Sequence, residues 1–128
     1  MKASLNSYRQ SPRKVRLVSD LVKGKPIADA LRLLSVTTKA AAHPLRKLIE
    51  SAVKSAKDQN VSSVDLYVKD FRVDAGATLK RSMPRARGSA FPILKRTCRV
   101  SLVLEERERP NEKVKAKNSK EIEKPAKK

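Results

Sequence analysis

Cysteine, histidine and long apolar runs are scarce in this sequence. Cys98 is the only cysteine among 128 residues, which excludes an internal disulfide framework and is typical of a reducing compartment. His43 is the only histidine, so we expect no metal site around it. No apolar run approaches the roughly 20 residues that span a bilayer, and the N-terminal MKASLNSYRQ lacks the hydrophobic core of a signal peptide. We therefore expect a cytoplasmic protein without membrane insertion.

Catalytic motifs are missing as well. The sequence has no glycine motif of the kind that cradles phosphate, no nucleophile with a partner base and no cluster of carboxylates. It therefore predicts no enzyme and no cofactor.

Acidic residues are few, and the basic residues are many. The chain has 31 Lys and Arg against 13 Asp and Glu, a net charge of +18. Residues 1–104 alone carry 22 basic and 7 acidic side chains, so the charge belongs to the part that we expect to fold. Self-repulsion on this scale destabilises a compact state unless a polyanion neutralises it. Nucleic acid is the leading partner, and an anionic membrane surface is the second.

Three helices are predicted in the first half of the chain. In SPRKVRLVSDLVKG, Ser11 can cap the helix, Pro12 suits its first position and Gly24 can end it. A second helix follows Pro26, and a third runs from about residue 38 to 60, where Pro44 either kinks the helix or marks its regular start. The expected buried stripes are Val15, Val18, Leu21 and Val22; Ile27, Ala30, Leu31 and Leu34; and Ala41, Leu45, Leu48, Ala52 and Ala56.

The first turn of the first helix is crowded with Arg13, Lys14 and Arg16. Cations at this end oppose the helix dipole, so an external anion explains them better than helix stability does. The alternative is a solvated basic turn.

Three strands are predicted, one near each end of residues 1–104 and one in the middle. In LYVKDFRVD, Leu66 and Val68 are expected on one face, with Tyr67, Phe71 and Val73 on the other. TCRVSLVL alternates so that Cys98 faces the core, and KASLNSYR supplies the third strand. The predicted fold is α+β, with three helices packed on one face of a small three-stranded antiparallel sheet.

A cationic insert separates two of these strands. We expect residues 74–98 to form a long protruding β-hairpin with its tip at about 83–88, reaching on the order of 40 Å from the sheet. The alternative is a flexible basic loop. The insert holds no acid in TLKRSMPRARGSAFPILKRTCR and seven cations: Lys80, Arg81, Arg85, Arg87, Lys95, Arg96 and Arg99. These suit bidentate contact with phosphate and also discourage edge pairing.

The last 24 residues have a different composition. Residues 105–128 carry six acidic and nine basic side chains, and Val114 and Ile122 are their only sizeable apolar residues. We expect a disordered tail after a single domain at residues 1–104.

Four segments, SPRKVRLVSDLVKGK, SAVKSA, LYVKDFRVDAGATLKRSMPRARG and LKRTCRVSLVL, resemble the bacterial form of the L-twenty-two family of large-subunit ribosomal proteins. The resemblance covers residues 3 to 104. It implies a structural protein that binds large-subunit ribosomal RNA, assists its folding and assembly, and extends the hairpin to the wall of the peptide exit tunnel. The other function that the residues allow is a free-standing nucleic-acid chaperone or regulator.

The resemblance also implies partners and site residues. The partners are large-subunit ribosomal RNA, neighbouring ribosomal proteins and the nascent peptide. AFPI at residues 90–93 departs from the basic return arm of the family, so Phe91 either stacks on a base or wedges the arm. The implied RNA-binding residues are Ser11, Pro12, Arg13, Lys14, Arg16, Lys80, Arg81, Arg85, Arg87, Lys95, Arg96 and Arg99. The implied tunnel-facing tip is Met83, Pro84, Arg87, Gly88, Ser89 and Ala90.

Overall fold

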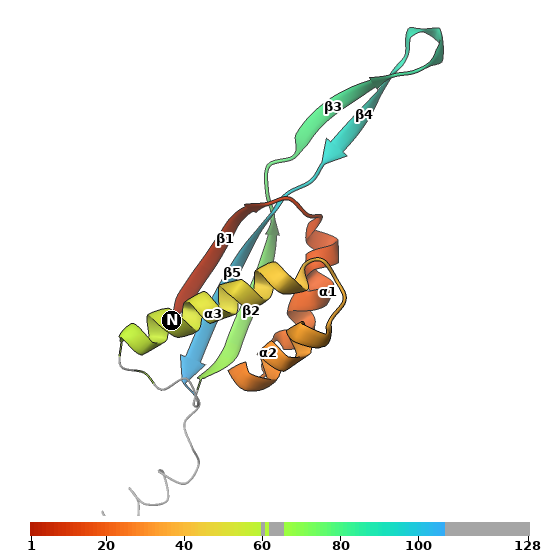
Figure 1. Ribbon diagram of the computed structural model, residues 1–128. Coiled ribbons are helices and arrows are strands. Elements are labelled where there is room, and N and C mark those ends of the chain that lie inside the picture. The colour runs from red at the N-terminus through yellow and green to blue at the C-terminus, as the bar shows by residue number, and fades with distance from the viewer. Residues whose placement is uncertain (60, 62–65, 107–128) are drawn as a thin grey trace, which may run out of the picture.

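The computed structural model describes residues 1–59, 61 and 66–106 (Figure 1). Three helices and a small antiparallel sheet are present, as the sequence predicts. The elements in chain order are β1 Lys2–Tyr8, α1 Pro12–Val22, α2 Ile27–Val36, α3 Ala42–Asp58, β2 Leu66–Ala75, β3 Leu79–Pro84, the short 3-10 turn Ala86–Gly88, β4 Ala90–Lys95 and β5 Cys98–Glu106.

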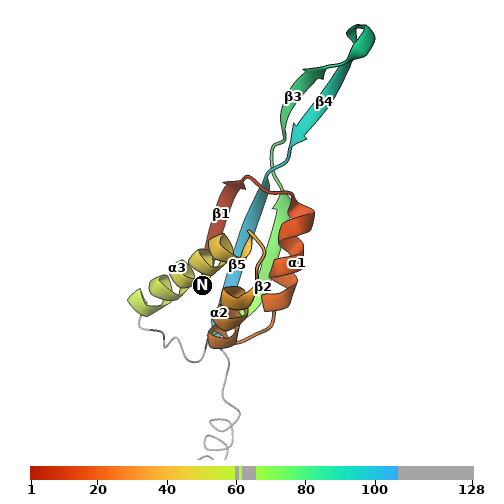
Figure 2. The same cartoon turned by 45° about the vertical axis from the view of Figure 1, so that its right-hand side comes forward.

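The main sheet has the strand order β1-β5-β2, with both pairs antiparallel. The three helices cover one of its faces (Figures 1 and 2). The residues of β5 alternate as expected, so that Cys98, Val100, Leu102 and Leu104 are buried under the helices. Because β5 is central, its buried side chains meet those of both neighbouring strands, and it anchors the core.

A β-bulge in β2 corrects the predicted faces of that strand. Val68 pairs with Leu104 and Asp70 with Val103, so Lys69 is an extra residue without its own partner. The extra residue reverses the alternation beyond it. Phe71 and Val73 are therefore buried on the same face as Leu66 and Val68, and the prediction that they point the other way was wrong.

Helix α1 departs from its predicted capping and stripe. Ser11 takes the N-cap position, but its hydroxyl makes no capping bond, and its backbone carbonyl accepts from the N–H groups of Lys14 and Val15 instead. Leu21 is half exposed, so its place in the buried stripe was wrong. Ser19 is buried on this helix, and its hydroxyl donates to the carbonyl of Arg16 at 3.0 Å, which satisfies the buried polar group.

Helix α3 resolves the two possibilities left open by Pro44. The helix begins at Ala42, so Pro44 lies in its first turn, where the missing N–H would have no partner in any case. The regular helix starts near the proline. Its buried face includes Ile49, which the predicted stripe omitted, and exposed His43 lies beside the start.

The strands of the cationic insert form a second sheet. β3 and β4 pair antiparallel from Leu79 opposite Lys95 to Pro84 opposite Ala90. We call β3, β4 and their turn, residues 79–95, the ribbon; it lies beyond the end of the main sheet (Figures 1 and 2). The main sheet ends where Ala75 pairs with Cys98, and the ribbon begins where Leu79 pairs with Lys95, so the strand pairing is interrupted within residues 74–98.

A narrow junction joins the ribbon to the main sheet. The N–H of Gly76 donates to the carbonyl of Thr97 at 2.9 Å, and the Thr97 hydroxyl donates to the carbonyl of Ala77 at 2.6 Å. A Cβ at residue 76 would lie 2.5 Å from the Thr97 hydroxyl oxygen. Only glycine allows the two chains to approach this closely without disturbing that bond.

The predicted boundary at residue 104 also needs correction. Strand β5 continues to Glu106, and the Glu105 carboxylate accepts from the Tyr67 hydroxyl at 2.6 Å and from the Lys69 ammonium at 2.7 Å. These bonds lower the pKa of Glu105, the bond from Lys69 having the larger effect. Glu105 and Glu106 therefore belong to the sheet. The rest of the predicted disordered tail, residues 107–128, lies outside the described residues.

A candidate nucleic-acid interface

The cations at the start of α1 have different environments. Arg13, Lys14 and Arg16 are all exposed, and for Arg13 and Lys14 no side-chain bond is found within the described residues. The guanidinium of Arg16 instead donates twice to the carbonyl of Val73, from Nε at 3.0 Å and from a terminal nitrogen at 2.9 Å. Arg16 thus ties α1 to the end of β2, a role that its position in the sequence did not reveal.

The structure brings this helix start near the base of the ribbon. An open hollow of about 420 Å³ lies between them. We call it the cationic hollow. Ser11 and Lys14 line it together with Lys95 and Arg96, although some eighty positions separate the two pairs in the sequence. The residues that line it are Arg9, Gln10, Ser11, Lys14, Leu94, Lys95 and Arg96.

Arg9 and Gln10 were missed in the sequence. Ser7 lies inside β1, where the pairing with β5 is irregular, and has a φ of 53°. Arg9 and Gln10 follow β1 in a short turn, in which the N–H of Gln10 donates to the carbonyl of Tyr8 at 2.8 Å. This turn delivers both side chains to the wall of the hollow. A single cation after a strand does not by itself predict a binding role. Only the closeness of Arg9 to the basic SPRK segment in the sequence could have indicated that it belongs to this site.

The ribbon exposes nearly all of its side chains. Lys80, Arg81, Arg85, Arg87 and Lys95 are exposed. Large apolar side chains lie among these cations with 44–55% of their surface exposed: Leu79, Met83, Phe91 and Leu94. A free protein gains nothing from exposing both kinds of side chain on a thin ribbon, so this surface is suited to a partner.

The end of the ribbon turns within residues 85–89. Arg87 and Gly88 have φ values of 58° and 69°, and the N–H of Arg85 donates to the carbonyl of Ser89 at 2.8 Å. A positive φ at a residue other than glycine is uncommon and occurs where a turn demands it. Met83 and Pro84, predicted at the tip, are the last residues of β3.

The Phe91 ring has a partner within the ribbon. The Arg85 guanidinium carbon lies 5.7 Å from its centroid, a cation–π distance, and Phe91 is paired across the strands with Met83. Phe91 thus braces the tip in the free protein. Its stacking on a base stays a prediction.

Ion pairs within the described residues are confined to the main sheet and the helices. They join Lys23 to Asp70, Arg32 to Asp29, Arg46 to Glu50, Lys69 to Glu105 and Arg72 to Asp74. In the described part of the chain, no ion pair engages a ribbon cation. Arg99, the last predicted cation, lies on β5 opposite Asp74 and therefore belongs to the main sheet. The cations of the ribbon are thus left without an acidic partner among the described residues.

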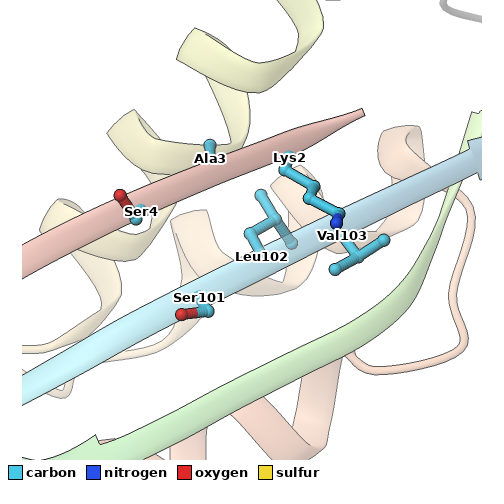
Figure 3. A pocket seen from close by; sticks show the side chains of 6 residues that line it. All are labelled: Lys2, Ala3, Ser4, Ser101, Leu102 and Val103. Carbon is cyan, nitrogen blue, oxygen red and sulfur yellow. The ribbon is translucent and has the colours of Figure 1, made fainter.

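Other surfaces of the described residues have fewer charged or reactive side chains. A shallow hollow between β1 and β5 is lined mainly by apolar surface, and Lys2 is the one ionisable side chain among the six that Figure 3 labels. Cys98 is buried, and burial raises the pKa of its thiol, which disfavours the thiolate form. Over residues 1–59, 61 and 66–106, no cluster of His, Cys, Asp or Glu could hold a metal ion. None of the helices described there is long and apolar enough to cross a membrane.

We expect Arg16→Ala to lower the free energy of unfolding by about 1 kcal/mol, because it removes the paired donors of the Val73 carbonyl. The double variant Arg13→Ala and Lys14→Ala should leave it within about 0.5 kcal/mol, since neither side chain supports the core. Urea denaturation followed by circular dichroism measures both. Equal destabilisation of the two variants would contradict the separation of their roles.

Together these features define a small, strongly basic α+β protein with an exposed cationic ribbon. The chain belongs to the family described as Ribosomal protein L22p/L17e, whose sequence profile matches residues 3–105. Large ribosomal subunit protein uL22 of Myxococcus xanthus is 50% identical over 107 residues, which cover 81% of this chain and 94% of that protein. The uL22 protein of Bdellovibrio bacteriovorus is 47% identical over 108 residues, with 84% and 98% covered. The uL22 protein of Acetivibrio thermocellus is 51% identical over 107 residues, with 83% and 86% covered.

Proposed function

We propose that this protein is a structural component of the large ribosomal subunit in the cytoplasm and that it binds large-subunit ribosomal RNA. The observation that carries the proposal is the set of ribbon cations, which have no acidic partner among the described residues. Phosphates of RNA would neutralise these cations and release counterions, a favourable term that the free protein cannot supply. The relatives are named as proteins of the large ribosomal subunit, which supports the assignment of this protein to the same particle.

The RNA-binding surface has two parts in this proposal. One is the start of α1, with Ser11, Pro12, Arg13 and Lys14, and with Arg16 in addition to its structural bond. The other part is the ribbon and its base, which would contact RNA through Lys80, Arg81, Arg85, Arg87, Lys95 and Arg96. Arg99 would add a contact from the main sheet. Because the cationic hollow joins the two parts, they dock as one surface and hold together the RNA segments that fold around them.

The tip of the ribbon has a different task. We assign Met83, Pro84, Arg87, Gly88, Ser89 and Ala90 to the wall of the peptide exit tunnel, where they would meet the nascent peptide. The turn at Arg87 and Gly88, which the bond from the Arg85 N–H to the Ser89 carbonyl closes, and the Arg85 contact on Phe91 support this assignment, since a passage needs side chains in defined positions.

Two variants test the division between the base and the tip of the ribbon. Replacing Lys80, Arg81, Lys95 and Arg96 by Ala should lower RNA affinity by about 100-fold at physiological salt and reduce incorporation into the large subunit. Deleting Met83, Pro84 and Arg85 should allow incorporation but change the response of the ribosome to tunnel-binding drugs. Sucrose-gradient fractionation and growth in the presence of such drugs measure the two effects.

The opposite result for either variant contradicts the division. A tip deletion that abolishes assembly would mean that the tip is needed for docking. Normal drug responses in every tunnel-dependent assay would remove the tunnel assignment. Recovery of the wild-type protein mainly away from the large subunit at physiological salt would favour a free-standing chaperone or regulator instead.

A further inference from the structure

The cationic hollow contains a side chain that its charge does not explain. Gln10 lies on the wall of the hollow, between Arg9 and the start of α1. Its side-chain oxygen Oε1 is buried, and across the part of the chain that the structure describes it accepts no hydrogen bond. Buried carbonyl oxygens are nearly always paired, and an unpaired one destabilises the state that contains it. A ligand that offers a donor to Gln10 would remove this penalty.

A phosphate group cannot supply that donor. The oxygens of a phosphodiester only accept hydrogen bonds, so they satisfy the cations of the hollow but leave Oε1 of Gln10 unpaired. The 2′-hydroxyl of ribose can donate as well as accept, and each sugar is bonded directly to its phosphate. The amino group of a base lies farther from the phosphate than the 2′-hydroxyl does, so it is less suited to reach Gln10 while the phosphate is bound in the hollow. The sugar hydroxyl is therefore the donor that fits beside a bound phosphate.

We propose that the cationic hollow binds one ribonucleotide unit, with Arg9, Lys14, Lys95 and Arg96 around the phosphate and Oε1 of Gln10 accepting from the 2′-hydroxyl. The last side-chain torsion of glutamine is soft, so the amide can turn its oxygen from the buried position toward the ligand. No acidic side chain lines the hollow to oppose the phosphate. This inference rests on the proposed function and deepens it, because it assigns a residue that distinguishes RNA from DNA.

The test compares the full-length wild type with Gln10→Leu, which keeps the side-chain size and removes the acceptor. Each protein is titrated by fluorescence anisotropy, at one salt concentration, with a short single-stranded RNA, the DNA of the same sequence and the 2′-O-methyl RNA. The wild type should prefer RNA over 2′-O-methyl RNA, and Gln10→Leu should reduce this preference by about five-fold, the effect of one hydrogen bond. The thermal unfolding midpoint of the variant should not fall, since the oxygen that it removes is unpaired.

The double variant Lys95→Ala and Arg96→Ala serves as the control. It should weaken binding of all three probes and keep their affinity ratios, because it removes only phosphate contacts. The inference is overturned if the wild type binds 2′-O-methyl RNA as tightly as RNA, or if a folded Gln10→Leu keeps the wild-type ratio. In both cases the proposed function stands. A wild type that binds none of the probes would overturn the proposed function as well.

Discussion

Raising the salt concentration from about 50 to about 200 mM is expected to weaken RNA binding by the full-length protein about 1,000-fold. About seven phosphate contacts, each contributing about −0.7, give a logarithmic slope near −5. This steep dependence follows because the ribbon cations have no ion pair in the described part of the chain, so each is free to displace a counterion from RNA. Filter binding at several salt concentrations measures the slope.

The variant that lacks Lys80, Arg81, Lys95 and Arg96 provides the matched control for this slope. Its logarithmic salt slope should be less steep than that of the wild type by about 3, because four phosphate contacts are lost. A slope near zero for the wild type would show that binding does not depend on phosphate neutralisation. An unchanged slope in the variant would place the contacts elsewhere on the protein.

Leu102→Ala is expected to lower the free energy of unfolding by about 2–5 kcal/mol. Leu102 is 1% exposed and lies on the central strand β5, opposite Ala3 of β1 and Phe71 of β2. The substitution would remove buried methyl groups from the place where both strand pairs meet the helices, and a cavity would remain. Urea denaturation of the full-length protein measures the change.

The neighbouring residue supplies the control for this core substitution. Val103 lies on the other face of β5 and is half-buried, opposite Lys2 and Asp70. Val103→Ala should cost less than about 1 kcal/mol, which reflects strand preference and partial burial. A larger loss for Val103→Ala than for Leu102→Ala would reverse the assignment of the two faces.

Periodicity predicted β5 and failed within β2 for a physical reason. In β5, strict alternation puts every second residue under the helices, so Cys98 and its apolar neighbours could be assigned from the sequence. In β2, the bulge at Lys69 adds one residue and reverses the alternation before Phe71. A bulge forms from pairing with a distant strand, and the local sequence of β2 contains no sign of it.

The sequence by itself determined the composition of the interface, because charge is a property of the residues and needs no fold. The excess of cations, the acid-free insert and the family resemblance could all be read from it. The tertiary structure alone decided how those cations are divided. It bonded Arg16 to the Val73 carbonyl, placed Arg99 in the main sheet and gathered Arg9, Gln10, Lys14, Lys95 and Arg96 around one hollow. These outcomes depend on contacts between segments that are far apart in the chain, which local residue patterns do not encode.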